Sequence, residues 1–182
     1  MAGKSSKTKG GAFERDMCRA LSLWMTDGKR DDVFWRSAMS GGRARVRFNK
    51  GEQPDVGGGD ITAVDPAGHP LTSLYVIECK SVRDANVLAL FTGGKTGVVQ
   101  FWQQVCRDAE DFYRQPMLLL KQYRQPVLIG LHASGGIPHE AQGVTSWEHD
   151  LLLMPLLDFL HRVTPLELGC VPLASEKGAT HE

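Results

Sequence analysis

Short apolar segments of strand length alternate along the chain with two longer segments of helical periodicity, and this order most constrains the fold. In the first long segment, apolar side chains recur at offsets of 4, 7, 8 and 11 from Phe13, which is one face of an α-helix. A second stripe predicts a helix over residues 97–115. Strand-like apolar segments lie at 33–35, 60–64, 74–80, 116–120 and 126–131. Helix, strands, helix, strands in this order predicts an α/β fold with a central mixed β-sheet flanked by helices.

The segment boundaries lead to further expectations. The first helix should begin at Gly11 and stop near Gly28. The segments 60–64 and 74–80 should form an antiparallel pair, and the apolar stretch that ends at Val163 should finish in a helix after Pro155. Residues 1–10 are expected to be a flexible basic tail, 11–171 a single domain, and 172–182 a frayed tail. A chain of 182 residues with 42% hydrophobic content suits one such domain.

Charge is balanced overall but unevenly distributed. Residues 1–50 contain 12 Lys and Arg against 5 Asp and Glu, and residues 51–182 contain 9 against 16. A basic N-terminal third can meet phosphates while an acidic remainder holds metal-binding carboxylates. A solvated charged surface with a disordered basic tail explains the same counts.

The sequence indicates neither a membrane segment nor a zinc site. It has no apolar run of 18 or more residues, and its basic N-terminus lacks the apolar core of a secretory signal, so a cytoplasmic location is expected. The four cysteines (18, 79, 106 and 170) show no C-x-x-C spacing, and the six histidines show no ligand spacing. We therefore expect free, largely buried thiols.

Three charged residues at the ends of apolar strands carry the chemical information. Asp60 begins one strand, and Glu78 and Lys80 end another. Residues i and i+2 of a strand point to the same side, so Glu78 and Lys80 should project together while Cys79 points to the opposite side. Such charges are costly to bury unless they pair or bind a cation. Two carboxylates with the Cys79 backbone carbonyl form a hard oxygen site suited to Mg²⁺, beside which the lysine ammonium can orient water or stabilise phosphate charge.

Two alternatives stay open at this point. An ordinary Glu–Lys pair at a strand edge, with an aspartate capping a turn, produces the same pattern. The aspartate itself is also ambiguous, because Pro54-Asp55 precedes Asp60 by a few residues. Asp60 is preferred because a strand-like segment follows it, whereas glycines follow Asp55.

With these residues the chain resembles the PD-(D/E)XK nuclease superfamily, and within it the archaeal and phage Holliday-junction resolvases. The resemblance covers roughly residues 10–132 and has five parts in order. They are G-x-x-x-E-R at the first helix, W-R-S-A-x-S-G-G at 35–42, G-D-I-x-A at 59–63, I-E-C-K-S at 77–81, and a glutamine-bearing helix followed by a Pro-led apolar strand. Such a chain would have the restriction-endonuclease-like core.

The resemblance implies roles for individual residues. Asp60 and Glu78 match the metal-binding carboxylates, Lys80 matches the catalytic lysine, and Glu14 matches a helix carboxylate that supports the metal site. A solvent-exposed Glu14 paired with Arg19 is the alternative for that helix position. Arg36 would reach a phosphate, with a structural salt bridge as its alternative. Ser40 matches a loop that contacts the scissile strand.

Further polar residues are candidates for binding DNA. Gln103 or Gln104 resembles a glutamine that positions the attacking water or a phosphate. Lys121 is a candidate phosphate contact. Arg43, Arg45 and Arg47 alternate with apolar residues, as on a strand with one basic face. The tail lysines 4, 7 and 9 add to this basic region.

The resemblance implies a Mg²⁺-dependent endodeoxyribonuclease, with Mn²⁺ as a substitute, that resolves four-way DNA junctions as a homodimer. A recombination or repair nuclease acting on duplex or single-stranded ends is an alternative, and so is a catalytically silent DNA-binding module. Two departures stand out. The spacing from Asp60 to Glu78 is longer than in the compact resolvases, which implies an extended hairpin, and residues 43–57 resemble an insertion.

Overall fold

The computed structural model describes residues 6–37, 58–135 and 143–171, and all structural statements refer to these residues. The helical elements are α1 (Ser6–Met25), η1 (Pro66–Gly68), α3 (His69–Leu74), α4 (Ala89–Thr92), α5 (Gly97–Asp111), η2 (Trp147–His149) and α6 (Leu156–Arg162). The strands are β1 (Phe34–Arg36), β2 (Ile61–Ala63), β3 (Tyr75–Val82), β4 (Gln115–Gln122), β5 (Val127–His132), β6 (Val144–Ser146) and β7 (Leu151–Pro155).

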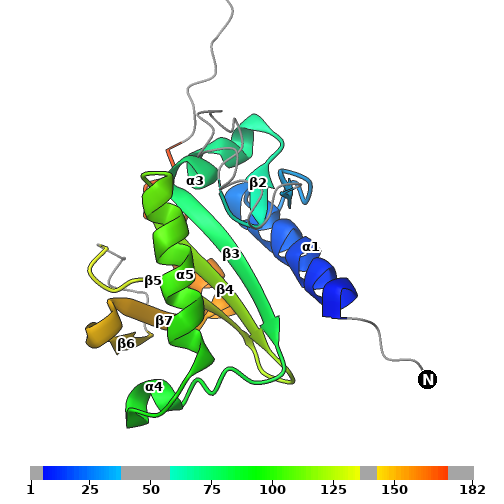
Figure 1. Cartoon of the computed structure of the whole chain (residues 1–182). Helices are drawn as coiled ribbons and strands as arrows, with labels where there is room; N and C mark the ends of the chain where they lie inside the picture. The colour runs from blue at the N-terminus through cyan, green and yellow to red at the C-terminus, as the bar shows by residue number, and fades with distance from the viewer. Residues whose placement is uncertain (1–5, 38–57, 136–142, 172–182) are drawn as a thin grey trace, which may run out of the picture.

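Within this part of the chain, five strands form the central sheet in the order β3-β4-β5-β7-β6 (Figure 1). The first pair, β3 and β4, is parallel and joined through α5, whereas the remaining pairs are antiparallel. A parallel pair needs a long crossover, whereas an antiparallel pair can be joined by a short turn, as β4 and β5 are here through residues 123–126. The mixed sheet flanked by helices confirms the α/β fold expected from the sequence.

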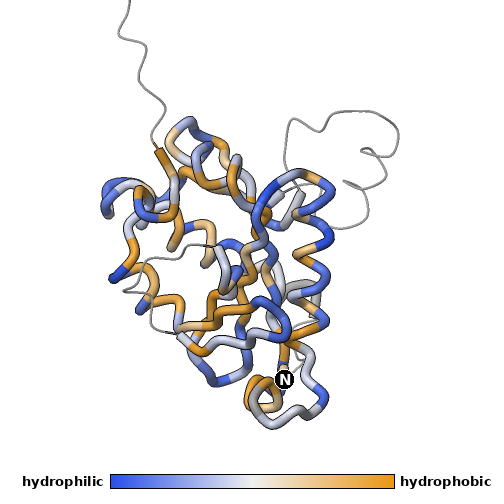
Figure 2. The backbone as a smooth tube through the Cα atoms, turned by 90° about the vertical axis from the view of Figure 1, so that its left-hand side faces the viewer, coloured by the Kyte–Doolittle hydropathy of each residue, from blue (hydrophilic) through white to orange (hydrophobic). Residues whose placement is uncertain are grey.

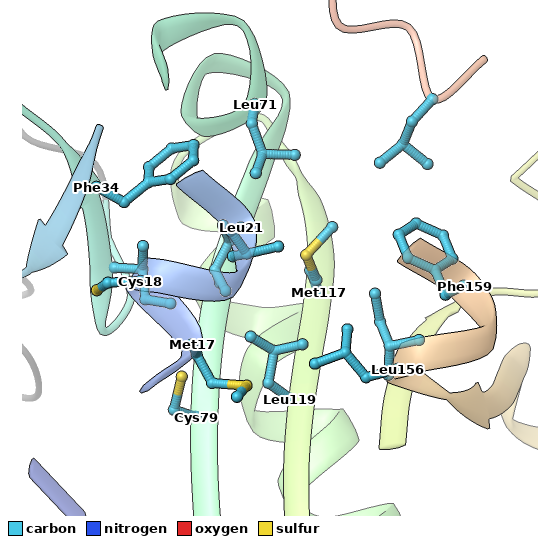
Figure 3. Packing of buried hydrophobic residues seen from close by; sticks show 14 of the residues in the cluster. Met17, Cys18, Leu21, Phe34, Leu71, Cys79, Met117, Leu119, Leu156 and Phe159 are labelled. Atoms are coloured by element: carbon cyan, nitrogen blue, oxygen red, sulfur yellow. The ribbon is translucent and has the colours of Figure 1, made fainter. Parts of the chain in front are cut away.

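Each face of the sheet has its own buried cluster, because side chains alternate between the faces along every strand. Ile77, Cys79 and Leu119 pack toward α1 and α6. Figure 3 shows Cys79 of β3 beside Met17 of α1. Val76 and Leu118 pack toward α5 on the opposite face. The hydrophobic strands accordingly run through the interior, and hydrophilic segments lie mainly at the outside (Figure 2).

A buried serine connects α1 to the small β1–β2 sheet. The Ser22 hydroxyl donates to the Cys18 carbonyl at 2.7 Å and accepts from the backbone N–H groups of Val33 and Phe34 at 3.1 and 3.0 Å. These bonds satisfy polar groups that would otherwise be buried without partners. They hold β1 against α1, and β1 pairs antiparallel with β2.

Several sequence expectations are corrected here. The first helix begins at Ser6, five residues before Gly11, and the long central helix ends at Asp111 rather than at 115. The expected antiparallel pair of 60–64 with 74–80 is wrong, since β2 pairs with β1. The segment just before β2 contacts β3 through a parallel bridge from Gly59 to Ile77. The connection between them is not an extended hairpin but the turn η1 and the helix α3. The strand β7 and helix α6 follow the expected division at Pro155.

Candidate active site

Two glycines allow the segment before β2 to lie directly against β3. Gly59 has a φ of +109°, and a Cβ at this position would lie 2.6 Å from the Ile77 carbonyl oxygen. A Cβ on Gly58 would lie 2.2 Å from the Phe112 ring. Only glycine tolerates both the backbone conformation and the contact at position 59, and a Cβ at position 58 would require the Phe112 ring to move, so these two residues determine how closely Asp60 approaches the strand.

Asp60 is held at the outer edge of β3 by its backbone and by its side chain. Its N–H donates to the Ile77 carbonyl at 2.8 Å, and its carboxylate accepts from the Cys79 N–H at 2.9 Å. Its own carbonyl accepts from the Ser37 N–H at 2.8 Å. In a strand the N–H and C=O of one residue point to the same edge, so the Cys79 carbonyl also points toward Asp60.

Glu78 and Lys80 project together on the α5 face of β3, as the two-residue spacing predicts. The Lys80 ammonium lies 2.5 Å from a Glu78 carboxylate oxygen. The same ammonium lies 5.9 Å from the centre of the Phe101 ring on α5, within the range of a cation–π contact. Lys80 is therefore held in place by one carboxylate and one aromatic ring.

The two carboxylates lie in an environment that opposes their negative charge. Asp60 and Glu78 are 9% and 8% exposed. Burial, with the charge of Glu78 as a second cause, raises the pKa of Asp60 to about 7. Burial also raises the pKa of Glu78, although the hydrogen bond and charge of Lys80 act in the opposite direction. A cation bound between these groups would offset the cost of burying them, so the donor set fits a divalent metal ion.

Glu14 lies near this centre but has a partner that the sequence did not indicate. Its carboxylate forms a salt bridge with Arg36 of β1. For Arg36, the structural salt bridge that was the alternative to a phosphate contact is therefore present. The alternative pairing of Glu14 with Arg19 is wrong, because Arg19 binds Asp31. The charge of Glu14 still contributes to raising the pKa values of Asp60 and Glu78. A role of Glu14 as a metal ligand stays a prediction.

The two candidate glutamines differ in placement. Gln103 is exposed on α5, whereas Gln104 is partly buried. Gln104 lies three residues after Phe101 and four before Asp108, on the same side of the helix. The charge of Asp108 contributes to raising the pKa of Glu78, so this side of α5 lies beside the site. Phe101 and Asp108 were not identified from the sequence as neighbours of the site. The position of Asp108, a carboxylate at the margin of an apolar helical stripe, could have indicated it.

The remaining DNA-binding candidates are only partly described. Lys121 lies at the C-terminal end of β4, in register with Ser81, and its ammonium is 5.6 Å from the Phe13 ring of α1. Ser40, Arg43, Arg45, Arg47 and Asp55 lie outside the described residues, as do Lys4 and the tail 172–182.

Three general expectations can be compared with the described ranges. All four cysteines are free, and three of them are buried, as expected. No helix in these ranges is long and apolar enough to cross a membrane. In the same ranges, no group of three or more His, Cys, Asp or Glu side chains is arranged to hold a metal ion, so an ion at the candidate site would be held by the carboxylates of Asp60 and Glu78 and the Cys79 carbonyl rather than by three side chains.

Comparison with known proteins adds independent information. A family model described as "Phage putative PDDEXK endonuclease" matches residues 5–147. Protein D14 of Escherichia phage T5 is 35% identical over 77 residues, which are 42% of this chain and 47% of that protein. The matched segment therefore spans about half the length of this relative. No solved structure matches the chain.

Proposed function

Because the chain belongs to the family of phage PD-(D/E)XK endonucleases, we propose that it hydrolyses phosphodiester bonds in DNA at Asp60, Glu78 and Lys80 with the help of Mg²⁺. The single observation that carries this proposal is the joint burial of two carboxylates beside a lysine at the edge of β3. Two buried carboxylates with raised pKa values destabilise a fold, so a chain that only binds DNA gains nothing from them.

The oxygen atoms available for an ion come from three neighbouring groups. The carboxylates of Asp60 and Glu78 and the Cys79 carbonyl would hold it, with water and DNA phosphate oxygens completing its shell, as is common for Mg²⁺. When bound, Mg²⁺ supplies Lewis acidity that polarises the scissile phosphate and lowers the pKa of water. Hard oxygen ligands favour Mg²⁺ or Mn²⁺.

The protein's own groups orient the reactants. Hydrolysis adds a hydroxyl group to phosphorus and a proton to the leaving oxygen, so a water molecule has to be aligned with the phosphate. The Lys80 ammonium, positioned by Glu78 and Phe101, can donate hydrogen bonds to that water or to a phosphate oxygen. Between the two glutamines, the position of Gln104 beside Phe101 favours it for holding the water or a phosphate.

The substrate that the resolvase resemblance favours is a four-way junction, cut by a homodimer. Two active sites related by a two-fold axis would suit paired incisions in a symmetric substrate. The phage relative supports an infected bacterial cell as the place of action. A recombination or repair nuclease that cuts duplex or single-stranded ends is the alternative within the same chemistry.

A cleavage assay on matched substrates tests these assignments. The purified chain is incubated with a four-way junction, a linear duplex and a single strand in Mg²⁺, and its mass is measured by sedimentation. Glu78→Gln and Lys80→Met should abolish cleavage while DNA binding in Ca²⁺ largely survives, because both groups act at the scissile phosphate. Glu110→Gln on the exposed side of α5 should cut normally.

Two outcomes would change the proposal. Cleavage that persists in Asp60→Asn but is lost in Asp55→Asn would reassign the metal-binding aspartate. A chain that binds DNA and cuts none of the three substrates in Mg²⁺ or Mn²⁺ would favour the silent DNA-binding module.

A further inference from the structure

The turn between β4 and β5 presents an aromatic ring and a cation to solvent. Tyr123 is 62% exposed, and the Arg124 guanidinium lies 5.1 Å from the centre of its ring. The turn is closed by a hydrogen bond from the Gln125 N–H to the Gln122 carbonyl at 3.1 Å. Residues 122–125 thus form the β4–β5 turn.

This turn carries an arginine where turn chemistry favours a different residue. Arg124 has a φ of +59°, a conformation that glycine and asparagine adopt most readily. This conformation is strained for a residue that has a Cβ. The guanidinium packs on the exposed Tyr123 ring, so the strained residue adds no buried contact to the core.

The turn is attached to the strand that carries the active site. The Tyr123 N–H donates to the Val82 carbonyl at 3.1 Å, and Val82 ends β3 four residues after Glu78. At about 3.3 Å per residue, the turn lies roughly 13 Å along the strand from Glu78. This distance corresponds to about four nucleotides of a duplex that rises 3.4 Å per base pair.

The surroundings of the turn are cationic. Residues 81–84 and 121–125 contain three cationic side chains, Arg83, Lys121 and Arg124, and one carboxylate, Asp84. These residues lie at the C-terminal ends of β3 and β4, toward the N-terminal half of α1, as Figure 1 and the Lys121–Phe13 contact show. A DNA strand that extends from the site along β3 to the turn would therefore lie beside positively charged side chains.

The opposite end of β4 offers a natural comparison. Tyr113 is 96% exposed and precedes Arg114, so it repeats the Tyr-Arg sequence of the turn. Its surroundings are acidic, because residues 108–115 contain three carboxylates and one cation. Arg114 lies over the Phe112 ring rather than over Tyr113. Tyr113 thus has the exposure of Tyr123 without its charge environment or its stacked cation.

We propose that the β4–β5 turn is a DNA-binding element in which Tyr123 stacks on a base face exposed at a branch point and Arg124 neutralises the adjoining phosphate. Continuous duplex DNA offers phosphates but no free base face, whereas a branch exposes base faces where helical stacking is interrupted. Stacking on an aromatic ring is tolerant of base identity because every base has a π-face. The turn would thus favour branched over linear DNA independently of sequence. This inference rests on the proposed nuclease function and specifies its substrate.

Binding and stacking are measured separately from cleavage, with the full-length chain in Ca²⁺. The probe is a four-way junction that carries 2-aminopurine at the branch point, and a linear duplex of the same sequence is the reference. The variants are Tyr123→Ala, Tyr123→Phe and the matched control Tyr113→Ala. Both positions lie on the surface, and circular dichroism verifies folding.

Tyr123→Ala should weaken junction binding by about 5- to 150-fold and should remove most of the change in 2-aminopurine fluorescence, since one stacked base contributes about 1–3 kcal/mol. Tyr123→Phe should behave like the wild type because the ring is kept, and Tyr113→Ala should change neither readout. Binding of the linear duplex should change less than twofold in each variant.

An unchanged ratio of junction to duplex affinity in Tyr123→Ala would overturn the inference, as would a Tyr123→Phe variant as weak as Tyr123→Ala. Failure of the wild type to bind either DNA would overturn it too. A wild type that binds the junction with a fluorescence change but cuts nothing in Mg²⁺ would refute the nuclease function and support the turn as a binding element.

Discussion

Replacing Asp60 by asparagine should stabilise the metal-free protein while it removes cleavage. Asp60 is buried beside Glu78, and these surroundings raise its pKa from 3.8 to about 7. Above pH 7 the folded protein therefore contains a carboxylate that would be better solvated in the unfolded chain. An amide has nearly the same shape and can still accept the hydrogen bond from the Cys79 N–H, but it has no charge.

The pKa difference sets the size of the effect. About three pKa units at 1.36 kcal/mol each correspond to a limit of about 4 kcal/mol. The amide oxygen is a weaker acceptor than the carboxylate, which reduces the gain by about 1–2 kcal/mol. We therefore expect Asp60→Asn to raise the free energy of unfolding by about 2 kcal/mol at pH 8 in EDTA.

The pH dependence has a defined sign. Between about pH 4 and pH 7, Asp60 is protonated in the folded protein and ionised in the unfolded chain, so folding takes up a proton. The stability that this proton contributes is complete below pH 4 and is lost as the pH rises through 7. The variant has no such group, so its gain over the wild type should grow from pH 4 to pH 8.

Urea unfolding followed by circular dichroism at pH 4, 6 and 8 measures this difference. Asp16→Asn on the exposed face of α1 is the control and should change stability little. Mg²⁺ should stabilise the wild type but not the Asp60→Asn variant, because only the wild type retains the full set of ligands. A variant that is no more stable than the wild type at pH 8, or one with the same gain at every pH, would refute the reasoning.

Three further predictions follow from the same site and its surroundings. Mg²⁺ and Mn²⁺ should support cleavage while Ca²⁺ permits binding only, and cleavage in excess EDTA would contradict a metal-dependent mechanism. Replacing Arg43, Arg45 and Arg47 together by alanine should reduce the slope of log affinity against log salt by about two to three units, since each phosphate contact contributes about 0.9. An unchanged slope would assign DNA binding to other residues. Gly59→Ala should destabilise the fold by roughly 2–4 kcal/mol in thermal or urea unfolding, because its Cβ would meet the Ile77 carbonyl at a strained φ. A smaller loss would mean that Asp60 does not depend on this close approach.

Local patterns in the sequence were sufficient for most of the elements. The periodicity around Phe13 predicted α1, and the alternation along β3 predicted that Glu78 and Lys80 share a face while Cys79 points to the other. Such inferences succeed because helical and strand periodicities depend on residues that are close in the sequence. That Glu78 and Lys80 share a face can be predicted without knowing which strands pair with β3.

Pairing between distant segments could not be predicted in the same way. The sequence suggested that the strand after Asp60 pairs antiparallel with β3, whereas β1 is its partner and α3 fills the connection. Strand pairing is determined by which buried surfaces fit together, and here the bonds of Ser22 hold β1 beside α1. The order of segments in the sequence does not indicate these contacts.

For the candidate site too, the sequence determined one part and the tertiary structure another. The sequence alone determined which residue types would meet at the strand ends, because charged side chains next to apolar segments are visible in any reading of residues 60–80. Only the tertiary structure decided that Arg36 binds Glu14, that Phe101 lies against Lys80, and that Asp60 meets the Cys79 N–H. The physical reason is that burial and pairing energies depend on distances across elements, and folding alone establishes those distances.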